Sequence, residues 1–444
     1  MSAGKSAGKW KASEELLRMF QAVGRASLAY DIQDSHSGNM AVRWTDEGGE
    51  DRIVITATGS QKGELDRSQL CFLSASETDY GYYKASSETD VHARILSLPG
   101  VRASMHAHVK ELVIATLDDG PKPAAVPPFI PVDPLGFHHL GGLVPIDWFA
   151  VPSGSPEMAR TIPERLADHV LTLVWGHGAM TKGRTLKEAF FRLCVANNAG
   201  AVVRQMGVLG VDVGGVRRKI LADPDAHFAY PPPKYEVEGD ERCDFPEEEE
   251  ILREFVKTGH RIFESRLSPF HTGSMSVRGV DAMLYAPKAS MPREIGGPLL
   301  KVPLGPAASD DAEAAIHKAI YAASDFQTVL HCYVPEAEAQ AHFVYPGESA
   351  PADRIVPVDA EGTFLYLVIP VLPPKFEMET LIRFLHDYKV VIVRGGGVWA
   401  VGAQSLSEVL HHPSSLREIL LYRSGAFQRG LDLRKMEPKK AKRW

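Results

Sequence analysis

The chain has 444 residues, more than one hydrophobic core usually serves, so its length predicts two domains of about 200 residues each. Its formal net charge of −7 argues against a nucleic-acid-binding surface, and the basic tail at 439–443 is interpreted as a solvated end. The sequence has no membrane-length apolar stretch, no signal-peptide pattern and no paired cysteines, which predicts a cytoplasmic protein with reduced thiols.

Hydrophobic periodicity in the first half predicts helices that alternate with strands. Apolar residues recur at helical spacing in three segments: 14–30, 89–98 and 186–203. Three other segments have the alternation or the β-branched, apolar content of strands: 51–57, 101–108 and 171–175. This order predicts a layered α/β domain in which helices cover a central sheet.

Residues 222–250 separate the two halves. They contain the run Pro231-Pro232-Pro233 and end in four consecutive glutamates, a composition that predicts an inter-domain connection. The glutamates precede Ile251, so the same run can also open a helix, because negative charge stabilises a helix N-terminus. We therefore expect a first domain at 1–221 that carries the candidate site, a linker at 222–250 and a second domain at 251–444.

The two halves repeat each other. Four blocks match in the same order: 36–43 with 271–278, 88–106 with 313–331, 130–133 with 356–359, and 173–178 with 392–397. Matches of this kind predict that one domain was duplicated, so that both halves share a fold.

Two histidines lie one strand step apart at the end of the segment 101–108. Side chains alternate between the faces of a strand, so Ser104, His106 and His108 share one face. Two imidazoles in this arrangement can chelate one metal ion. The alternative is a half-buried histidine pair whose polar atoms are satisfied within the protein.

A third histidine, His177, stands between two glycines after the apolar segment 171–175. The glycines allow a sharp turn that presents the imidazole at the end of a strand, whereas a solvent-facing turn is the alternative. Three imidazoles that leave one position open for water or substrate are typical of catalytic rather than structural zinc sites.

Ser86, Ser87 and Glu88 precede the predicted helix at 89–98. Ser87 and Asp90 fit a capping box, in which the side chains serve only the helix N-terminus. The alternative is a phosphate site, because hydroxyls at a helix N-terminus suit an anion. In that case Glu88 would lie beside any metal held by the following strand.

Two turns of small residues add further donors. Thr58 and Gly59 follow the strand at 51–57, and Asn39 ends the turn Ser37-Gly38-Asn39. Each is a common turn by itself, but together they supply hydrogen-bond donors for a group the size of phosphate.

In their order and separation, the motifs SGN, TGS, SSE, HxH and GHG resemble the class II aldolase/adducin family over residues 14–205. The resemblance implies two tandem three-layer α/β/α domains, each with a mostly antiparallel central sheet. It implies a metal site held by His106, His108 and His177, with Zn2+ expected and Mn2+, Co2+ or Fe2+ as alternatives. It also implies that Glu88 is the acid/base. A substrate phosphate is expected to contact five residues: Asn39, Thr58, Gly59, Ser86 and Ser87.

The reaction implied by the resemblance is retro-aldol cleavage of a ketose phosphate to dihydroxyacetone phosphate and an aldehyde. The alternatives are a related sugar-phosphate dehydratase, decarboxylase or epimerase. Glu88 argues against an epimerase, because that branch of the family usually has aspartate there. A non-catalytic adducin-like module is disfavoured, because adducins lack the metal histidines.

The second half retains the repeat but loses the site. Its residues His331 and Glu313 match His106 and Glu88. The other positions change: His108 to Tyr333, His177 to Gly396, Thr58-Gly59 to Pro287-Lys288, and Ser86 to Asp311. One histidine and one carboxylate are too few for tight zinc binding, so we expect this half to be catalytically silent.

The resemblance also implies an assembly. Members of the family typically form fourfold rings in which each site lies at a subunit boundary. Two copies of a duplicated chain can form such a ring with twofold symmetry alone, so we expect a homodimer. His138, His139 and Tyr366 are candidates for a proton donor across the boundary.

Overall fold

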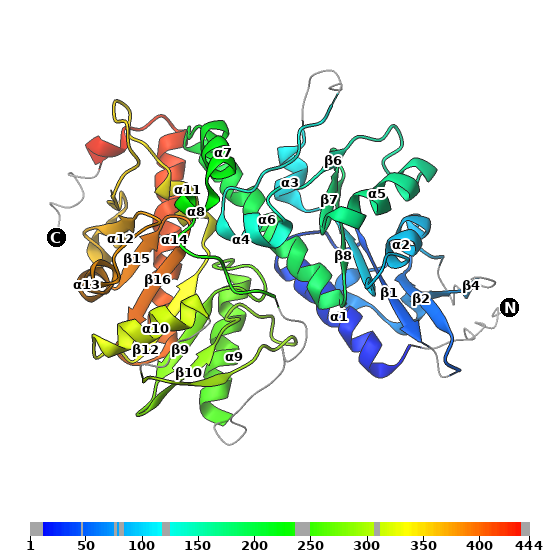
Figure 1. Cartoon of the computed structure of the whole chain (residues 1–444), viewed down its shortest axis with the longest axis horizontal. Coiled ribbons are helices and arrows are strands. Elements are labelled where there is room, and N and C mark those ends of the chain that lie inside the picture. The colour runs from blue at the N-terminus through cyan, green and yellow to red at the C-terminus, as the bar shows by residue number, and fades with distance from the viewer. Residues whose placement is uncertain are drawn as a thin grey trace. The chain divides into compact units, whose positions relative to one another are not determined.

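The computed structural model describes residues 12–45, 48–74, 78–79, 84–117, 125–235, 249–305 and 311–436 (Figure 1). The basic tail at 439–443, the linker residues 236–248 and Cys243 lie outside the described residues. Two compact units are present. The first takes the described residues up to Ile130 together with His139–Asn197, and the second takes Pro131–His138 and the residues from Asn198 onward. The domain boundaries expected from the sequence stay a prediction.

The first unit contains an eight-stranded sheet with the order β4-β3-β2-β1-β5-β8-β7-β6. All neighbouring strands are antiparallel except β6 and β7. The strands are β1 (Asn39–Thr45), β2 (Asp51–Thr56), β3 (Leu70–Leu73), β4 (Thr78–Asp79), β5 (Ala103–Ala107), β6 (Ile146–Asp147), β7 (Leu171–Val174) and β8 (Gly178–Gly183).

The second unit contains an equivalent sheet with the order β11-β10-β9-β12-β16-β15-β14-β13, in which only β14 and β15 are parallel. Its strands are β9 (Ser274–Arg278), β10 (Ala282–Ala286), β11 (Leu300–Pro303), β12 (Thr328–Cys332), β13 (Arg354–Ile355), β14 (Ile369–Leu372), β15 (Val390–Val393) and β16 (Gly397–Gly402). When the terminal strands β4 and β13 are set aside, the two orders correspond strand by strand. Asn39 pairs with His106 in one sheet and Ser274 with His331 in the other, as the predicted duplication requires.

Helices cover both sheets. In the first half of the chain they are α1 (Glu14–Ala29), α2 (Thr89–Leu96), α3 (Lys110–Ala115), α4 (Pro134–Leu140), α5 (Pro156–Asp168), α6 (Leu186–Val208), α7 (Val213–Ala222) and α8 (Pro224–His227), with 3-10 turns η1 (Lys62–Glu64) and η2 (Arg67–Gln69). In the second half they are α9 (Glu249–Glu264), α10 (Ala312–Ala322), α11 (Pro335–Ala341), α12 (Ala360–Leu365), α13 (Met378–Tyr388) and α14 (Leu406–Gln428). None of the described helices is both long and apolar enough to cross a membrane.

The alternation of side chains along β15 shows the three layers of the second unit. Val391 and Val393 join a core that includes α10 and α13. Val390 and Ile392 join another core that includes α9, α11 and α14. Each sheet face is therefore buried under its own helical layer.

The first unit follows the same plan. Val91 of α2 and Ile162 of α5 pack against one face of its sheet. Met40 and Met105 are fully buried on the opposite face, where Figure 1 shows α1 and α6. All five residues of β5 are buried, so the alternation in 101–108 marks two covered faces and not a solvated one.

Two side chains of the described part of the predicted linker contact the second unit. Phe228 is 3% exposed and belongs to an apolar cluster of the second unit, and the Tyr230 hydroxyl donates to the Gly396 carbonyl oxygen at 2.6 Å. These two aromatic side chains anchor the Pro-rich stretch to the second unit. Helix α9 begins at Glu249, so the glutamate run does open a helix.

Candidate metal centre

Two strand ends bring the three histidines together. His106 is near the end of β5, His108 lies just beyond it, and His177 occupies the turn between β7 and β8. The flanking glycines make that turn fit. Gly176 has φ +66°, and a Cβ on Gly178 would come within 2.6 Å of the Ala107 carbonyl oxygen. A side chain at position 178 would therefore push His177 away from β5.

The three imidazoles form a compact triad. Their ring centroids are 4.7–5.0 Å apart, and one nitrogen from each lies within 4.8 Å of the others. Within the described ranges, this is the one group of histidine, cysteine or acidic residues with such spacing. His106 is buried, whereas His108 and His177 are half-buried, so the triad is open on one side. Three ligands with an open position fit a catalytic metal.

Hydrogen bonding leaves the ligand nitrogens available. His106 Nδ1 donates to the Ala179 carbonyl oxygen at 2.9 Å, which places its lone pair on Nε2. Both His106 Nε2 and His177 Nδ1 are buried without a hydrogen-bond partner. A buried nitrogen without a hydrogen-bond partner lowers the stability of the fold, and a bound metal ion would give both nitrogens a partner. The residues therefore fit a divalent metal.

Burial also keeps the triad uncharged. Desolvation, joined at His108 and His177 by the proximity of the His106 ring, lowers the pKa of His106, His108 and His177 to about 4 each. Neutral imidazoles are the form that binds a metal ion at neutral pH.

Glu88 lies next to the triad. Its Oε2 is 3.8 Å from His106 Nε2 and accepts a hydrogen bond from Asn39 Nδ2 at 2.8 Å, while Oε1 is buried without a partner. Burial raises the pKa of the Glu88 carboxyl, against the effects of Asn39 and the nearby histidines. Glu88, and not Ser87, occupies the N-cap position of α2, and no side chain makes a capping hydrogen bond there, so the predicted capping box of Ser87 and Asp90 is not formed.

The expected phosphate residues fall into an inner and an outer group. Asn39 and Ser86 are buried, and Asn39 Nδ2 donates to Ser86 Oγ at 3.0 Å. Thr58, Gly59 and Ser87 are exposed. The Thr58 hydroxyl donates to the Ala85 carbonyl oxygen at 2.9 Å, which ties the TGS turn to the SSE segment. The inner group thus orients Glu88, while the outer group lies at the solvent-accessible edge of the candidate site.

The sequence did not single out His92 or Lys62, which support these residues. His92 Nε2 bonds the Asn39 side-chain oxygen, and its Nδ1 is 2.9 Å from Ser104 Oγ. Burial lowers the pKa of His92 to about 3, so the ring is neutral and fixes the Asn39 amide with its nitrogen toward Glu88. The sequence signal was the match of His92 with His317 in the second repeat.

Lys62 ties two loops together. It is 1% exposed, and its Nζ donates to the carbonyl oxygens of His36 at 3.0 Å and Ser60 at 2.9 Å. These contacts join the loop before Asn39 to the TGS turn. Only the fold separates Lys62 from an ordinary surface lysine, because its position in the sequence carries no distinct pattern.

Comparison with known proteins places the chain in a family. The model of the class II aldolase and adducin N-terminal domain matches residues 18–202 and again residues 253–420, which is most of the chain. This protein belongs to the class II aldolase and adducin family.

Individual relatives cover one repeat of this chain. A curated protein from Haemophilus influenzae, 3-oxo-tetronate 4-phosphate decarboxylase, is 28% identical over 169 residues, 38% of this chain and 76% of that protein. L-fuculose-1-phosphate aldolase from Thermus thermophilus is 26% identical with a TM-score of 0.37, covering 43% of this chain and 94% of its own. A sugar-phosphate aldolase from Thermotoga maritima is 21% identical with a TM-score of 0.36, covering 47% and 95%.

In the second class II aldolase domain the equivalent position is filled by side chains. The Tyr333 hydroxyl donates to Glu313 Oε1 at 2.8 Å, and His331 Nδ1 is 3.0 Å from Glu313 Oε2. His331 Nε2 donates to the Gly396 carbonyl oxygen at 2.8 Å, and the Trp399 ring stacks on His331 at 4.3 Å. His331 Nε2 is therefore engaged within the protein, and His331 Nδ1 faces the Glu313 carboxylate.

The three candidate proton donors differ in exposure and in their contacts. His138 is exposed, and His139 is half-buried against Phe191, with ring centroids 5.0 Å apart. Tyr366 is 6% exposed, and its hydroxyl is 2.6 Å from His412 Nδ1. A role for any of them across a boundary stays a prediction.

Proposed function

We propose that this protein is a zinc-dependent lyase that cleaves a ketose phosphate to dihydroxyacetone phosphate and an aldehyde. The observation that carries the proposal is the triad of neutral imidazoles with a buried, partly unpartnered Glu88 carboxylate beside it. A zinc ion held by His106, His108 and His177 would supply the Lewis acid that polarises the substrate carbonyl.

The side chains around the triad have separate tasks. Glu88 Oε1 has no partner within the protein, so it is available to accept and return the substrate proton. Asn39 holds the other carboxylate oxygen, and His92 holds Asn39, which keeps Glu88 in one orientation. The exposed Thr58, Gly59 and Ser87 would receive the phosphate, whose binding positions the bond to be broken.

Decarboxylation of a phosphorylated 3-oxo acid is the second candidate. One observation favours it: the Haemophilus influenzae relative is named as such a decarboxylase. In both reactions a carbon–carbon bond near a carbonyl breaks, and its electron pair stays on the carbonyl fragment. The same metal ligands could serve either reaction. The reactions differ in the other fragment, which is an aldehyde formed as the substrate hydroxyl loses its proton in retro-aldol cleavage and CO2 in decarboxylation.

Product analysis tests the proposal. The metal-loaded protein should form dihydroxyacetone phosphate from a panel of ketose phosphates and no CO2 from phosphorylated 3-oxo acids. CO2 release without aldol cleavage would instead support the decarboxylase. A protein that binds zinc but turns over neither class would contradict a lyase function.

We also propose that two chains form a pseudo-fourfold ring. Every residue of α11 is buried in the second unit, where Ala339 packs with Val132 and Val202 of the first repeat. The counterpart helix α3 is followed by Leu117, which is 65% exposed, and carries Ile114, which is 51% exposed.

In the second repeat, exposed apolar side chains lie in the segments that correspond to residues 131–138 and 198–202 of the first repeat. Phe364 is 66% and Tyr422 is 50% exposed. A second copy of the chain could place these side chains over Ile114 and Leu117 near the triad. The contact would repeat the one in which residues of the first repeat cover α11. Native mass spectrometry should show a dimer of about 97 kDa, twice the 48.6 kDa chain, with one zinc ion per chain. A stable monomer, or two zinc ions per chain, would overturn this assembly.

A further inference from the structure

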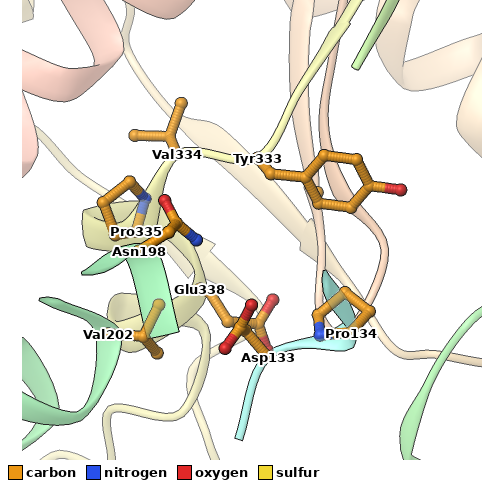
Figure 2. A pocket seen from close by; sticks show the side chains of 9 residues that line it. Asp133, Pro134, Asn198, Val202, Tyr333, Val334, Pro335 and Glu338 are labelled. Carbon is orange, nitrogen blue, oxygen red and sulfur yellow. The ribbon is translucent and has the colours of Figure 1, made fainter. Parts of the chain in front are cut away.

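A small pocket in the second unit lies beside the position that corresponds to the metal centre. Tyr333, the counterpart of His108, and Gly397, the counterpart of Gly178, form part of its wall. Asp133, which precedes α4, Asn198 of α6 and Glu338 of α11 complete it (Figure 2). The space between these side chains is small enough to be filled by one water molecule or one ion.

Two acceptor atoms of the pocket lack a hydrogen-bond donor. Asp133 and Asn198 are 2% and 4% exposed, and the Oδ1 atom of each is buried without a hydrogen-bond partner. Asp133 Oδ2 accepts from the Gly136 amide at 2.9 Å, so only Oδ1 is left for the pocket. Two buried acceptors that face a space of this size call for a positive or donating occupant.

Charge gives the same indication. Figure 2 shows the Asp133 and Glu338 carboxylates side by side, and none of the lining residues is lysine, arginine or histidine. Glu338 is tied to the Gly395 amide at 3.0 Å and to His342 Nε2 at 3.0 Å. Burial first, and then the charge of Glu338, raise the pKa of the Asp133 carboxyl to about 7, although hydrogen bonds from the Gly136 amide and the Asn198 side chain act in the opposite direction. A negative charge here needs compensation.

We propose that Asp133, Asn198 and Glu338 form a site for a hard metal cation, such as Na+, K+, Mg2+ or Ca2+. Their donors are all oxygen atoms, which suit hard cations, whereas the three imidazoles of the first unit suit zinc and its neighbours. The site would stabilise the second unit in place of the metal that its histidine and tyrosine cannot hold. It stands independently of the reaction proposed above.

Thermal unfolding of the zinc-loaded protein tests this site. At pH 8, chlorides of the four cations replace choline chloride at constant ionic strength, so that only specific binding changes the Tm. At about 100 times its Kd, the preferred cation should raise the Tm by about 5–10 °C. Asp133→Asn should abolish the shift, and Asn198→Leu serves as a second variant should the first fail to fold.

Asp359→Asn is the matched control. Asp359 occupies the same motif in the second repeat, and its Oδ2 accepts from the Gly362 amide at 2.7 Å, as Asp133 Oδ2 does from Gly136. This variant should keep the cation-dependent shift, and so should His106→Ala, which affects only the zinc site. Three outcomes would overturn the proposal: no cation exceeds choline, Asp133→Asn keeps the shift, or Asp359→Asn loses it equally. A Tm that is the same in all cations but rises when the pH is lowered from 8 to 6 would show that a proton on Asp133, and not a metal cation, compensates the charge.

Discussion

Replacing Glu88 by glutamine should separate proton transfer from folding. Glu88 is 2% exposed, and burial raises the pKa of its carboxyl. Keeping this carboxylate charged therefore costs free energy in the folded protein. Glutamine keeps an oxygen for the Asn39 donor at 2.8 Å and removes that charge, so the free energy of unfolding should change by less than about 1 kcal/mol. It cannot accept a proton, so kcat should fall about 10²–10⁴-fold, or about 3–5 kcal/mol in the barrier.

Glu313→Gln is the matched variant in the second unit. Glu313 is fully buried and holds His331 at 3.0 Å, Ser274 at 2.6 Å and Tyr333 at 2.8 Å. Losing this charge should lower the free energy of unfolding by about 3 kcal/mol and leave kcat per folded molecule unchanged. The two variants are thus expected to have opposite signatures.

Steady-state kinetics, urea unfolding and zinc content of the same preparations measure all three quantities. A Glu88→Gln protein with full zinc and a kcat within threefold of wild type would refute the acid/base role. A Glu313→Gln protein with an unchanged free energy of unfolding but no turnover would refute the expectation that the second unit is catalytically silent.

Three further predictions follow from the same contacts. His177→Ala should abolish activity and lower the zinc content measured by mass spectrometry, because one of three ligands is lost, and unchanged zinc would contradict the triad. Lys62→Gln should raise KM for phosphorylated substrates more than it lowers kcat, because it frees the loop before Asn39 from the TGS turn; Lys62→Arg should rescue part of the loss, and an unchanged KM would count against this role. Burial opposes ionisation of Glu313, but His331, Ser274 and Tyr333 hold the pKa of that carboxyl below its usual 4.5. The stability it contributes should therefore be present above that pH and be lost as the pH falls below it, whereas Glu313→Gln should flatten this part of the urea-unfolding profile measured against pH.

Short-range patterns in the sequence predicted six elements of the first half and the candidate metal histidines, and the resemblance to the family joined the three histidines into one site. Strand alternation put His106 and His108 on one side of β5, and the glycines around His177 marked its turn. The matched blocks of the two halves predicted two copies of one fold, and the two strand orders and the two family matches confirm this.

Only the tertiary structure decided how these residues are supported. His92 and Lys62 bond partners up to 53 residues away in the sequence, and no local pattern encodes contacts of that range. The same holds for Tyr230, whose ring lies in a Pro-rich stretch that composition alone describes as a linker, yet whose hydroxyl bonds Gly396.

The pocket around Asp133 is the clearest case. Asp133 and Asp359 occupy equivalent motifs, and each accepts a hydrogen bond from the backbone amide three residues later. Nothing in the sequence distinguishes these two local contacts. Burial is the first cause of the raised pKa of the Asp133 carboxyl, and the charge of Glu338, which is 205 positions later in the chain, raises this pKa as well. Electrostatic effects depend on distance in space and on burial, and both are properties of the fold and not of the local sequence.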